Sequence, residues 1–291
     1  MLVRALALVG TIALAAPSAL AADAPIRIVA AETFYGEVAA AIGGSGVDVE
    51  SIAISPDADP HDFAPPPSVA RTVADADIVV MNGLDYDHWM ESLVEAAPKD
   101  GRTVVDVAEL LGATPGGNPH LWYDPRAVPA LAKALAEELA ARDPGNAAGY
   151  RERLAAYDAS LGTLSAQIAE IRGRFAGTPV IASEPVFGLM AEALGLDMLG
   201  DDFQRAVMNE TEPSPKAIAA VEDDIRSGRA RVLFYNHQVV DPLTERLLAI
   251  AEDAKVPVVA VTESMPAGST YVDWMRSQLD ATARALAAPA S

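Results

Sequence analysis

Short apolar runs alternate with longer stretches of mixed polarity along most of the chain. The runs are rich in β-branched residues and continuous rather than alternating, which is typical of strands buried on both faces of a parallel sheet. They lie at residues 26–31, 47–54, 78–82, 103–106, 179–183, 231–236 and 257–262. The stretches between them predict helices at 34–42, 88–97, 125–142, 186–194, 215–227, 242–254 and 271–286. This alternation predicts an α/β fold with mainly parallel sheets.

One long stretch separates the first four strands from the last three. Its apolar residues recur at alternating spacings of four and three, which indicates a helix; they are Tyr150, Leu154, Tyr157, Leu161, Leu164, Ile168, Ile171 and Phe175. Asp143 and Pro144 precede it and Gly177 follows it, as expected for a helix start and stop. A helix of ~26 residues spans roughly 39 Å. We therefore expect a rigid strut between two α/β halves, with a helix packed on one large sheet as the alternative.

These elements predict a domain organisation of three parts after an N-terminal leader. We expect an N-terminal lobe at 22–142, a connecting helix at 143–176 and a C-terminal lobe at 177–291. The leader, residues 1–21, has Arg4 before an apolar run and ends in Ala19-Leu20-Ala21, the pattern of a secretory signal peptide rather than of a membrane anchor. Because the chain has no cysteine to carry a lipid, we expect a periplasmic protein without a lipid anchor.

Composition narrows the chemistry. The 291 residues contain 21 Lys+Arg against 41 Asp+Glu, for a formal net charge of −20. Such an acidic chain is unsuited to neutralising phosphates, so we expect no nucleic-acid partner. The absence of cysteine excludes disulfides, thiolate zinc sites and iron–sulfur clusters. A metal site in this chain must therefore use histidine, carboxylate or carbonyl ligands.

Two of the four histidines and two glutamates lie where ligands of an α/β protein are expected. His61 stands in the loop ADPHDF and His120 in NPHLWYDP, each downstream of a predicted strand. Glu184 and Glu263 directly follow the predicted strands 179–183 and 257–262. Ligand sites of open α/β sheets lie at the carboxyl ends of the strands. Imidazole and carboxylate suit Mn²⁺, Fe²⁺ or Zn²⁺, so the four residues form a candidate metal site.

Each of these residues also has a structural interpretation. Glu184 precedes Pro185 and is placed to cap a helix, whereas the others are compatible with exposed loops. His237 also follows a strand and is an alternative ligand, while His88 begins a helical stretch and fits a surface role. Two other function classes remain open: a secreted metal-dependent hydrolase using the same residues, and a binding protein for an organic solute or anion.

Several blocks resemble, in order along the whole mature chain, the cluster A-I metal-binding proteins of ABC transporters. The blocks are AAETFYGEVAAAIGG, ADPHDF, NPHLWYDP, SEPVFGLM, EPSP and VTESMPAGSTYVDWM. The resemblance implies two Rossmann-like lobes joined by one long rigid helix, with a zinc, manganese or iron ion held between them. It also implies a monomeric, non-enzymatic solute-binding protein that delivers the ion to a membrane permease.

The resemblance also implies a ligand set. His61 and His120 match the first two family ligands, and Glu184 matches the third, which is His in many zinc binders and Glu in many manganese or iron binders. Glu263 stands where the family commonly has Asp, which is a departure. The chain also lacks the His-rich loop of many zinc members. We expect metal affinity to fall between about pH 7.5 and 5.5 as imidazoles take up protons, with the carboxylates adding little.

Overall fold

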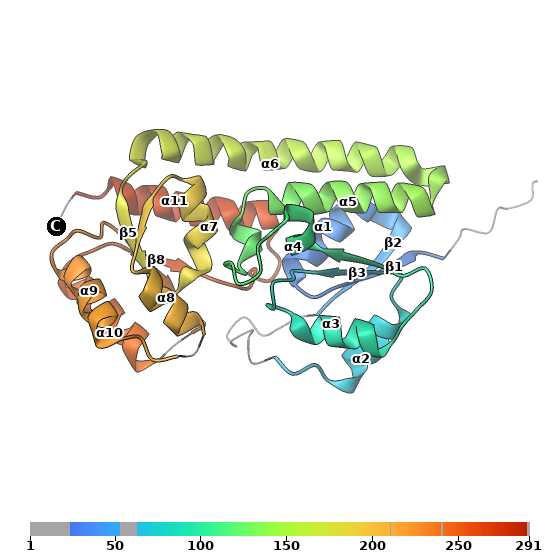
Figure 1. The fold of residues 1–291 in the computed structure, drawn as a ribbon. Coiled ribbons are helices and arrows are strands. Elements are labelled where there is room, and N and C mark those ends of the chain that lie inside the picture. The colour runs from blue at the N-terminus through green and yellow to red at the C-terminus, as the bar shows by residue number, and fades with distance from the viewer. Residues whose placement is uncertain (1–23, 53–62, 210, 240, 290–291) are drawn as a thin grey trace, which may run out of the picture.

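Two four-stranded parallel sheets form the framework of the protein (Figure 1). The computed structural model describes residues 24–52, 63–209, 211–239 and 241–289. The first sheet has the order β2-β1-β3-β4, from β1 (Ile26–Ala30), β2 (Val47–Ser51), β3 (Ile78–Met81) and β4 (Thr103–Asp106). The second has the order β6-β5-β7-β8, from β5 (Pro179–Ala182), β6 (Asp197–Leu199), β7 (Leu233–Asn236) and β8 (Val258–Val261). The predicted fold class is confirmed.

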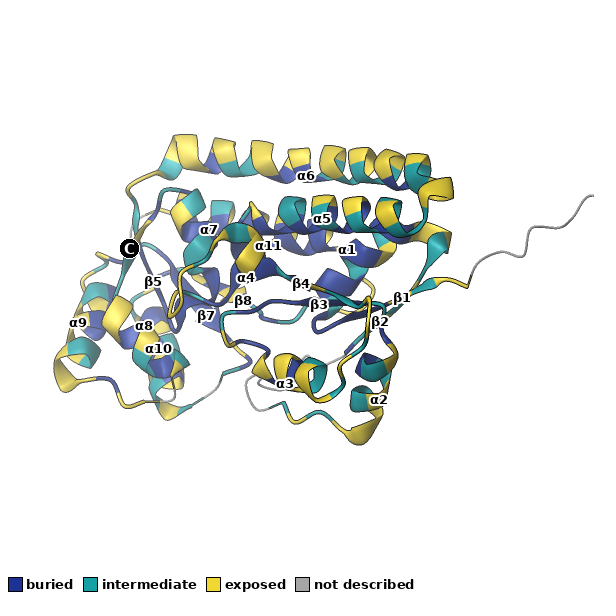
Figure 2. Cartoon of the chain, turned by 45° about the vertical axis from the view of Figure 1, so that its right-hand side comes forward, coloured by how far each residue is buried: buried dark blue, intermediate teal, exposed yellow. Residues whose placement is uncertain are grey.

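Helices cover both faces of each sheet, as the continuous apolar strands require. The central strands β3 and β7 are buried along their whole length. On the first sheet, α1 (Thr33–Gly43) and α5 (Ala127–Arg142) lie on one side, and α2 (Pro67–Asp75) and α3 (His88–Ala96) on the other (Figures 1 and 2). The second half is covered by α7 (Gly188–Ala193), α8 (Asp201–Met208), α9 (Pro215–Arg226), α10 (Pro242–Asp253) and α11 (Tyr271–Ala287). The short helix α4 (Val107–Leu111) follows β4.

The long helix α6 (Ala147–Phe175) has 29 residues and runs along both halves of the molecule (Figure 1). It packs against α1 and α5 of the first half and against α11 of the second. It buries only Tyr150, Leu161, Leu164 and Ile171, and its outward face is exposed (Figure 2). The predicted strut is therefore present, whereas the predicted lobe boundaries at 22–142, 143–176 and 177–291 stay a prediction. No helix among the described residues is long and apolar enough to cross a membrane.

Among the described residues, one strand and three α-helices were not predicted from the sequence. The edge strand β6 has three residues, and α2 buries a single side chain, Val73, so neither leaves a clear apolar pattern. Helix α4 is one turn long. Helix α8 begins at Asp201 and Asp202, and acidic residues in a first turn interact favourably with the positive end of the helix dipole. The predicted signal peptide at 1–21 lies outside the described residues.

Candidate metal centre

Three of the four predicted ligands meet between the two sheets. Glu184 follows β5 and Glu263 follows β8, at the carboxyl edge of the second sheet. His120 comes from the first half, in the loop that leads into the 3₁₀ turn Leu121–Tyr123. The three residues are buried, with 0–3 % of their surface exposed, and each offers one ligand atom within 4.8 Å of the other two. An imidazole and two carboxylates in this arrangement form a candidate site for a transition-metal ion.

Asn118 fixes which nitrogen of His120 faces the cluster. Its Oδ1 lies 2.6 Å from His120 Nδ1 and also accepts the His120 backbone N–H at 3.0 Å. An amide oxygen is an acceptor only, so Nδ1 carries the proton and Nε2 presents its lone pair. Nε2 is fully buried without a hydrogen-bond partner and lies 3.5 Å from Glu263 Oε2. The ring is therefore held in the tautomer that binds a metal through Nε2.

One amide joins the two carboxylates. Asn236, the last residue of β7, donates from Nδ2 to Glu184 Oε1 at 2.5 Å and to Glu263 Oε1 at 2.8 Å. Gln238 Oε1 accepts the backbone N–H of Glu263 at 2.6 Å, which fixes the backbone of that ligand. The hydroxyl of Tyr86 donates to Glu263 Oε2 at 3.2 Å, across the boundary between the two halves. Both glutamates are thus oriented by neighbouring polar groups.

The turn that carries Tyr86 is held by a buried carboxylate. Asp87 accepts the backbone N–H of Asn82 at 2.6 Å and that of Gly83 at 2.9 Å. Within this turn Leu84 and Asp85 adopt positive φ angles of 52° and 65°, which side chains rarely favour. Closing the turn in this way directs the Tyr86 hydroxyl towards Glu263.

Burial shifts the protonation of the cluster. Burial lowers the pKa of His120 to about 4, against an opposing effect of Glu184, so the imidazole is neutral at pH 7. Burial and the nearby Glu263 carboxylate raise the pKa of Glu184 to about 8. The two glutamates therefore share a proton at neutral pH. The expectation that the carboxylates add little to the pH dependence is wrong, because it assumed the pKa of an exposed glutamate.

Neither of the other two histidines in the described part of the chain belongs to the cluster. His61 lies outside the described residues, so its predicted role stays a prediction. His237, the alternative ligand, is exposed, and so is His88 at the start of α3. Asn118 and Asn236 were missed as functional residues, although both lie beside residues that the sequence singled out, in NPH and FYNHQ. Hydrogen bonding to a ligand depends on side-chain direction, which residue spacing does not reveal.

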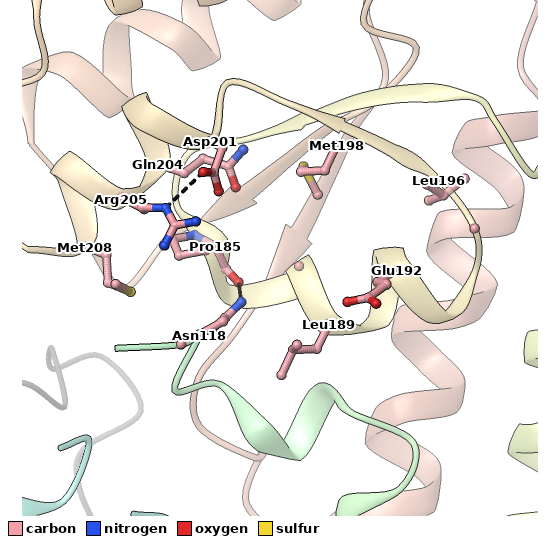
Figure 3. A pocket seen from close by; sticks show the side chains of 13 residues that line it. Asn118, Pro185, Leu189, Glu192, Leu196, Met198, Asp201, Gln204, Arg205 and Met208 are labelled. Atoms are coloured by element: carbon pink, nitrogen blue, oxygen red, sulfur yellow. Dashed lines mark hydrogen bonds and ion pairs between the residues drawn. The ribbon is translucent and has the colours of Figure 1, made fainter. Parts of the chain in front are cut away.

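A cavity of about 560 Å³ lies beside the cluster (Figure 3). Its wall includes Asn118 and Pro185, and Asn118 Nδ2 donates to the Pro185 carbonyl at 2.6 Å. Arg205 and Asp201 of α8 pair at 2.9 Å on the opposite side. None of the three clustered residues lines this cavity. It therefore borders the residues that orient the ligands rather than the ligands themselves.

Known proteins resemble this chain over most of its length. The sequence model of the family described as "ZnuA: Zinc-uptake complex component A periplasmic" matches residues 28–285. The manganese ABC transporter substrate-binding lipoprotein PsaA of Streptococcus mitis is 26% identical over 90% of this chain and 89% of its own. The metal ABC transporter substrate-binding lipoprotein FimA of Streptococcus parasanguinis is 25% identical over 96% of this chain and 95% of its own length.

Solved structures share the fold. The periplasmic zinc-binding protein TroA from Treponema pallidum superposes with a TM-score of 0.76 at 20% identity, over 91% of this chain and all of that one. The Mn²⁺ complex of FpvC from Pseudomonas aeruginosa superposes with a TM-score of 0.74 at 21% identity, over 90% of this chain and 98% of that one. These likenesses establish the two-lobed architecture with its long helix.

The predicted localisation is wrong on this comparison. We expected a periplasmic protein, exported by a signal peptide and not anchored by lipid, because the sequence contains no cysteine. The streptococcal relatives are named lipoproteins, which are lipid-anchored. The absence of cysteine from the sequence was not enough to predict that the protein has no lipid anchor.

Proposed function

Because the chain belongs to the ZnuA family, we propose that it captures a divalent transition-metal ion and delivers it to the permease of an ABC transporter. The ion is the cargo, Zn²⁺ or Mn²⁺, with Fe²⁺ as a further candidate. Relatives that cover about nine-tenths of the chain are named as metal and manganese ABC transporter substrate-binding proteins. The aligned region covers most of this chain and most of each relative, so the proposal concerns the whole chain.

The observation that carries the proposal is the buried cluster with one unpartnered ring nitrogen. His120 Nε2 has no hydrogen-bond partner, and buried polar atoms are rarely left in that state. A metal ion held by His120, Glu184 and Glu263 would satisfy it and would neutralise both carboxylates. We propose His61, which follows β2 along the chain, as the fourth ligand.

The family consists of substrate-binding components of transporters, so the protein is not an enzyme. A metal-dependent hydrolase needs an open coordination position with a water and a general base beside it. Here the two carboxylates that would serve as base are both bonded to Asn236. This supports carriage of the ion over hydrolysis.

We further propose that the protein acts as a monomer and binds no nucleic acid. The net charge of −20 supports the second part, since phosphates repel such a chain.

Metal titration tests the proposed function. Wild-type protein is expected to bind one Zn²⁺ or Mn²⁺ ion per chain. Calorimetric titration in the presence of a competing chelator measures this binding. His120→Ala removes a direct metal bond and leaves two carboxylates to repel each other, so binding is expected to be lost or greatly weakened. His88→Ala is the matched control, because His88 is exposed and lies outside the cluster. Equal affinity in all three proteins, with unchanged circular dichroism, contradicts the site.

A further inference from the structure

One short turn carries a ligand of the cluster together with a residue that reaches the opposite half. The 3₁₀ turn Leu121–Tyr123 follows His120 directly, and the backbone N–H of Tyr123 donates to the His120 carbonyl at 3.1 Å. The side chain of Tyr123 is fully buried. His120 and Tyr123 are therefore parts of one hydrogen-bonded unit, so contacts that fix the Tyr123 side chain also fix the backbone of the ligand.

The side chain of Tyr123 contacts the second half beside both glutamates of the cluster. Its hydroxyl donates to the carbonyl of Thr262, the residue before Glu263, at 2.9 Å. Its ring lies edge-on to that of Phe187, three residues after Glu184, with the ring centroids 5.3 Å apart. A single side chain of the first half thus contacts the chain next to each of the two glutamates.

Two residues of α11 add to this contact. In the orientation that satisfies its hydrogen bonds, the amide oxygen of Gln278 lies 3.2 Å from the Tyr123 hydroxyl. Gln278 and Thr262 both belong to the second half, so the hydroxyl bonds across the boundary with either acceptor. The hydroxyl of Tyr271 donates to the carbonyl of Trp122 at 2.7 Å. A second bond from the other half therefore holds the same turn.

The ligand atoms of the two halves are held at the spacing that an ion requires. His120 Nε2 and Glu263 Oε2 are 3.5 Å apart. Two ligands at about 2.0–2.2 Å from one tetrahedral ion lie roughly 3.3–3.6 Å from each other. Displacing one ligand by more than about 0.5 Å removes this match. Contacts that fix the turn of His120 against the second half therefore prepare the site for an ion.

We propose that Tyr123 is a positioning residue of the metal site, and that its hydroxyl keeps His120 at binding distance from Glu184 and Glu263. The inference rests on the proposed function and names a residue outside the ligand set that sets the affinity of the site. Tyr123 does not bind the ion, because its hydroxyl donates to a backbone carbonyl. Loss of the hydroxyl leaves the ligands in place but lets the turn move against the second half, which weakens binding and alters the ligand geometry.

Tyr123→Phe tests this role, because it removes the hydroxyl and keeps the ring against Phe187. The affinity for Zn²⁺, measured by calorimetry with a competing chelator, is expected to fall about ten-fold, the lower end of what loss of a supporting contact costs. The visible absorption spectrum of bound Co²⁺ should also change, since it depends on the geometry of the ligands. A role confined to stability would lower the melting temperature and leave that spectrum unchanged.

Tyr150→Phe is the matched control, because Tyr150 is also a buried tyrosine with a hydrogen-bonded hydroxyl. That hydroxyl donates to Asp143 Oδ2 at 2.9 Å, seven residues away along the chain, and does not join the two halves. Tyr150→Phe should keep the affinity and the Co²⁺ spectrum of wild-type protein. Tyr271→Phe removes the other bond to the turn and should act in the same direction as Tyr123→Phe, so it decides the matter if Tyr123→Phe does not fold.

The proposal is overturned if the folded variant, Tyr123→Phe or in its place Tyr271→Phe, binds Zn²⁺ with wild-type affinity or keeps the wild-type Co²⁺ spectrum. It is also overturned if Tyr150→Phe weakens binding to the same extent, because the effect would then reflect the general loss of a buried hydrogen bond. Failure of wild-type protein to bind Zn²⁺ or Mn²⁺ would instead refute the proposed function.

Discussion

The side chain of Asn118 performs two tasks at the cluster. Its oxygen accepts from His120 Nδ1, and its nitrogen donates to the carbonyl of Pro185, the residue after Glu184. It therefore sets the tautomer of a ligand from the first half and contacts the backbone beside a ligand from the second. Gly188 leaves room for this contact, since a Cβ there would lie 2.9 Å from Asn118 Nδ2.

Asn118→Ala is expected to weaken metal binding by roughly 10–100-fold, the usual cost of losing the partner of a ligating histidine. Gly188→Ala should weaken binding in the same direction without removing the amide, because its Cβ displaces Asn118. Calorimetric titration of both variants measures the effect. Asn146→Ala is the control, because Asn146 lies on an exposed turn away from the cluster. Wild-type affinity in both site variants would contradict the role of Asn118.

The shared proton predicts how affinity depends on pH. Burial and Glu263 raise the pKa of Glu184 to about 8, so below that pH the empty pair holds a proton that the metal must displace. Apparent affinity should therefore rise as pH increases towards 8 and level off above it. The pKa of His120 is lowered to about 4, so protonation of this imidazole weakens metal binding only near that pH.

Calorimetry in buffers of different ionisation enthalpy counts the displaced protons. About one proton per metal is expected at pH 7, falling towards none above pH 8. Proton release near zero at pH 7 would mean that both glutamates are already ionised in the empty site.

At the scale of elements, the long helix α6 contains two glycines in its interior. Gly162 and Gly173 lie within this helix, where glycine costs conformational entropy. A Cβ at either position would meet no atom within 4 Å. These two glycines are therefore not required by packing.

Gly162→Ala and Gly173→Ala are each expected to stabilise the protein by about 0.5–1 kcal/mol. Together they should raise the melting temperature by a few degrees, roughly 2–4 °C per kcal/mol for a chain of this size, without changing metal affinity. Gly46→Ala is the opposing control, because its Cβ would approach the Tyr150 hydroxyl to within 2.4 Å and should destabilise the protein. A loss of stability from both helix substitutions would show that α6 needs these glycines.

The sequence predicted the elements that have a strong pattern and failed on those without one. Seven strands and the long helix follow from continuous apolar runs and a regular spacing. The edge strand β6 and the helices α2 and α4 bury too few residues to leave such a pattern, and α8 buries only two apolar residues, Phe203 and Val207. At the site, strand ends indicated Glu184 and Glu263, whereas His237, which also follows a strand, is exposed and lies outside the cluster.

At the scale of the whole molecule, one hydrophobic core continues across both halves. It includes Ile28 and Val80 of the first sheet together with Val180 and Phe234 of the second. Side chains also bond across the boundary: Tyr123 donates to the carbonyl of Thr262 at 2.9 Å, and Tyr271 to that of Trp122 at 2.7 Å. Such a continuous core couples the unfolding of the two halves.

We expect the metal-free protein to unfold in a single transition in scanning calorimetry. Zn²⁺ at 100 times its dissociation constant should add about 2.7 kcal/mol of stability, moving the whole transition upwards. His120→Ala should unfold in the same way but respond little to Zn²⁺. Two separate transitions, only one of them sensitive to metal, would contradict the coupling of the halves.

We propose that His120, Glu184 and Glu263 hold a metal ion between the two halves. Anomalous diffraction from crystals of the Zn²⁺-loaded protein, recorded on both sides of the zinc absorption edge, tests it most directly. One strong anomalous peak is expected about 2.0–2.2 Å from His120 Nε2 and from one oxygen of each glutamate. A peak elsewhere on the chain, with His120 Nε2 still without a partner, would contradict it.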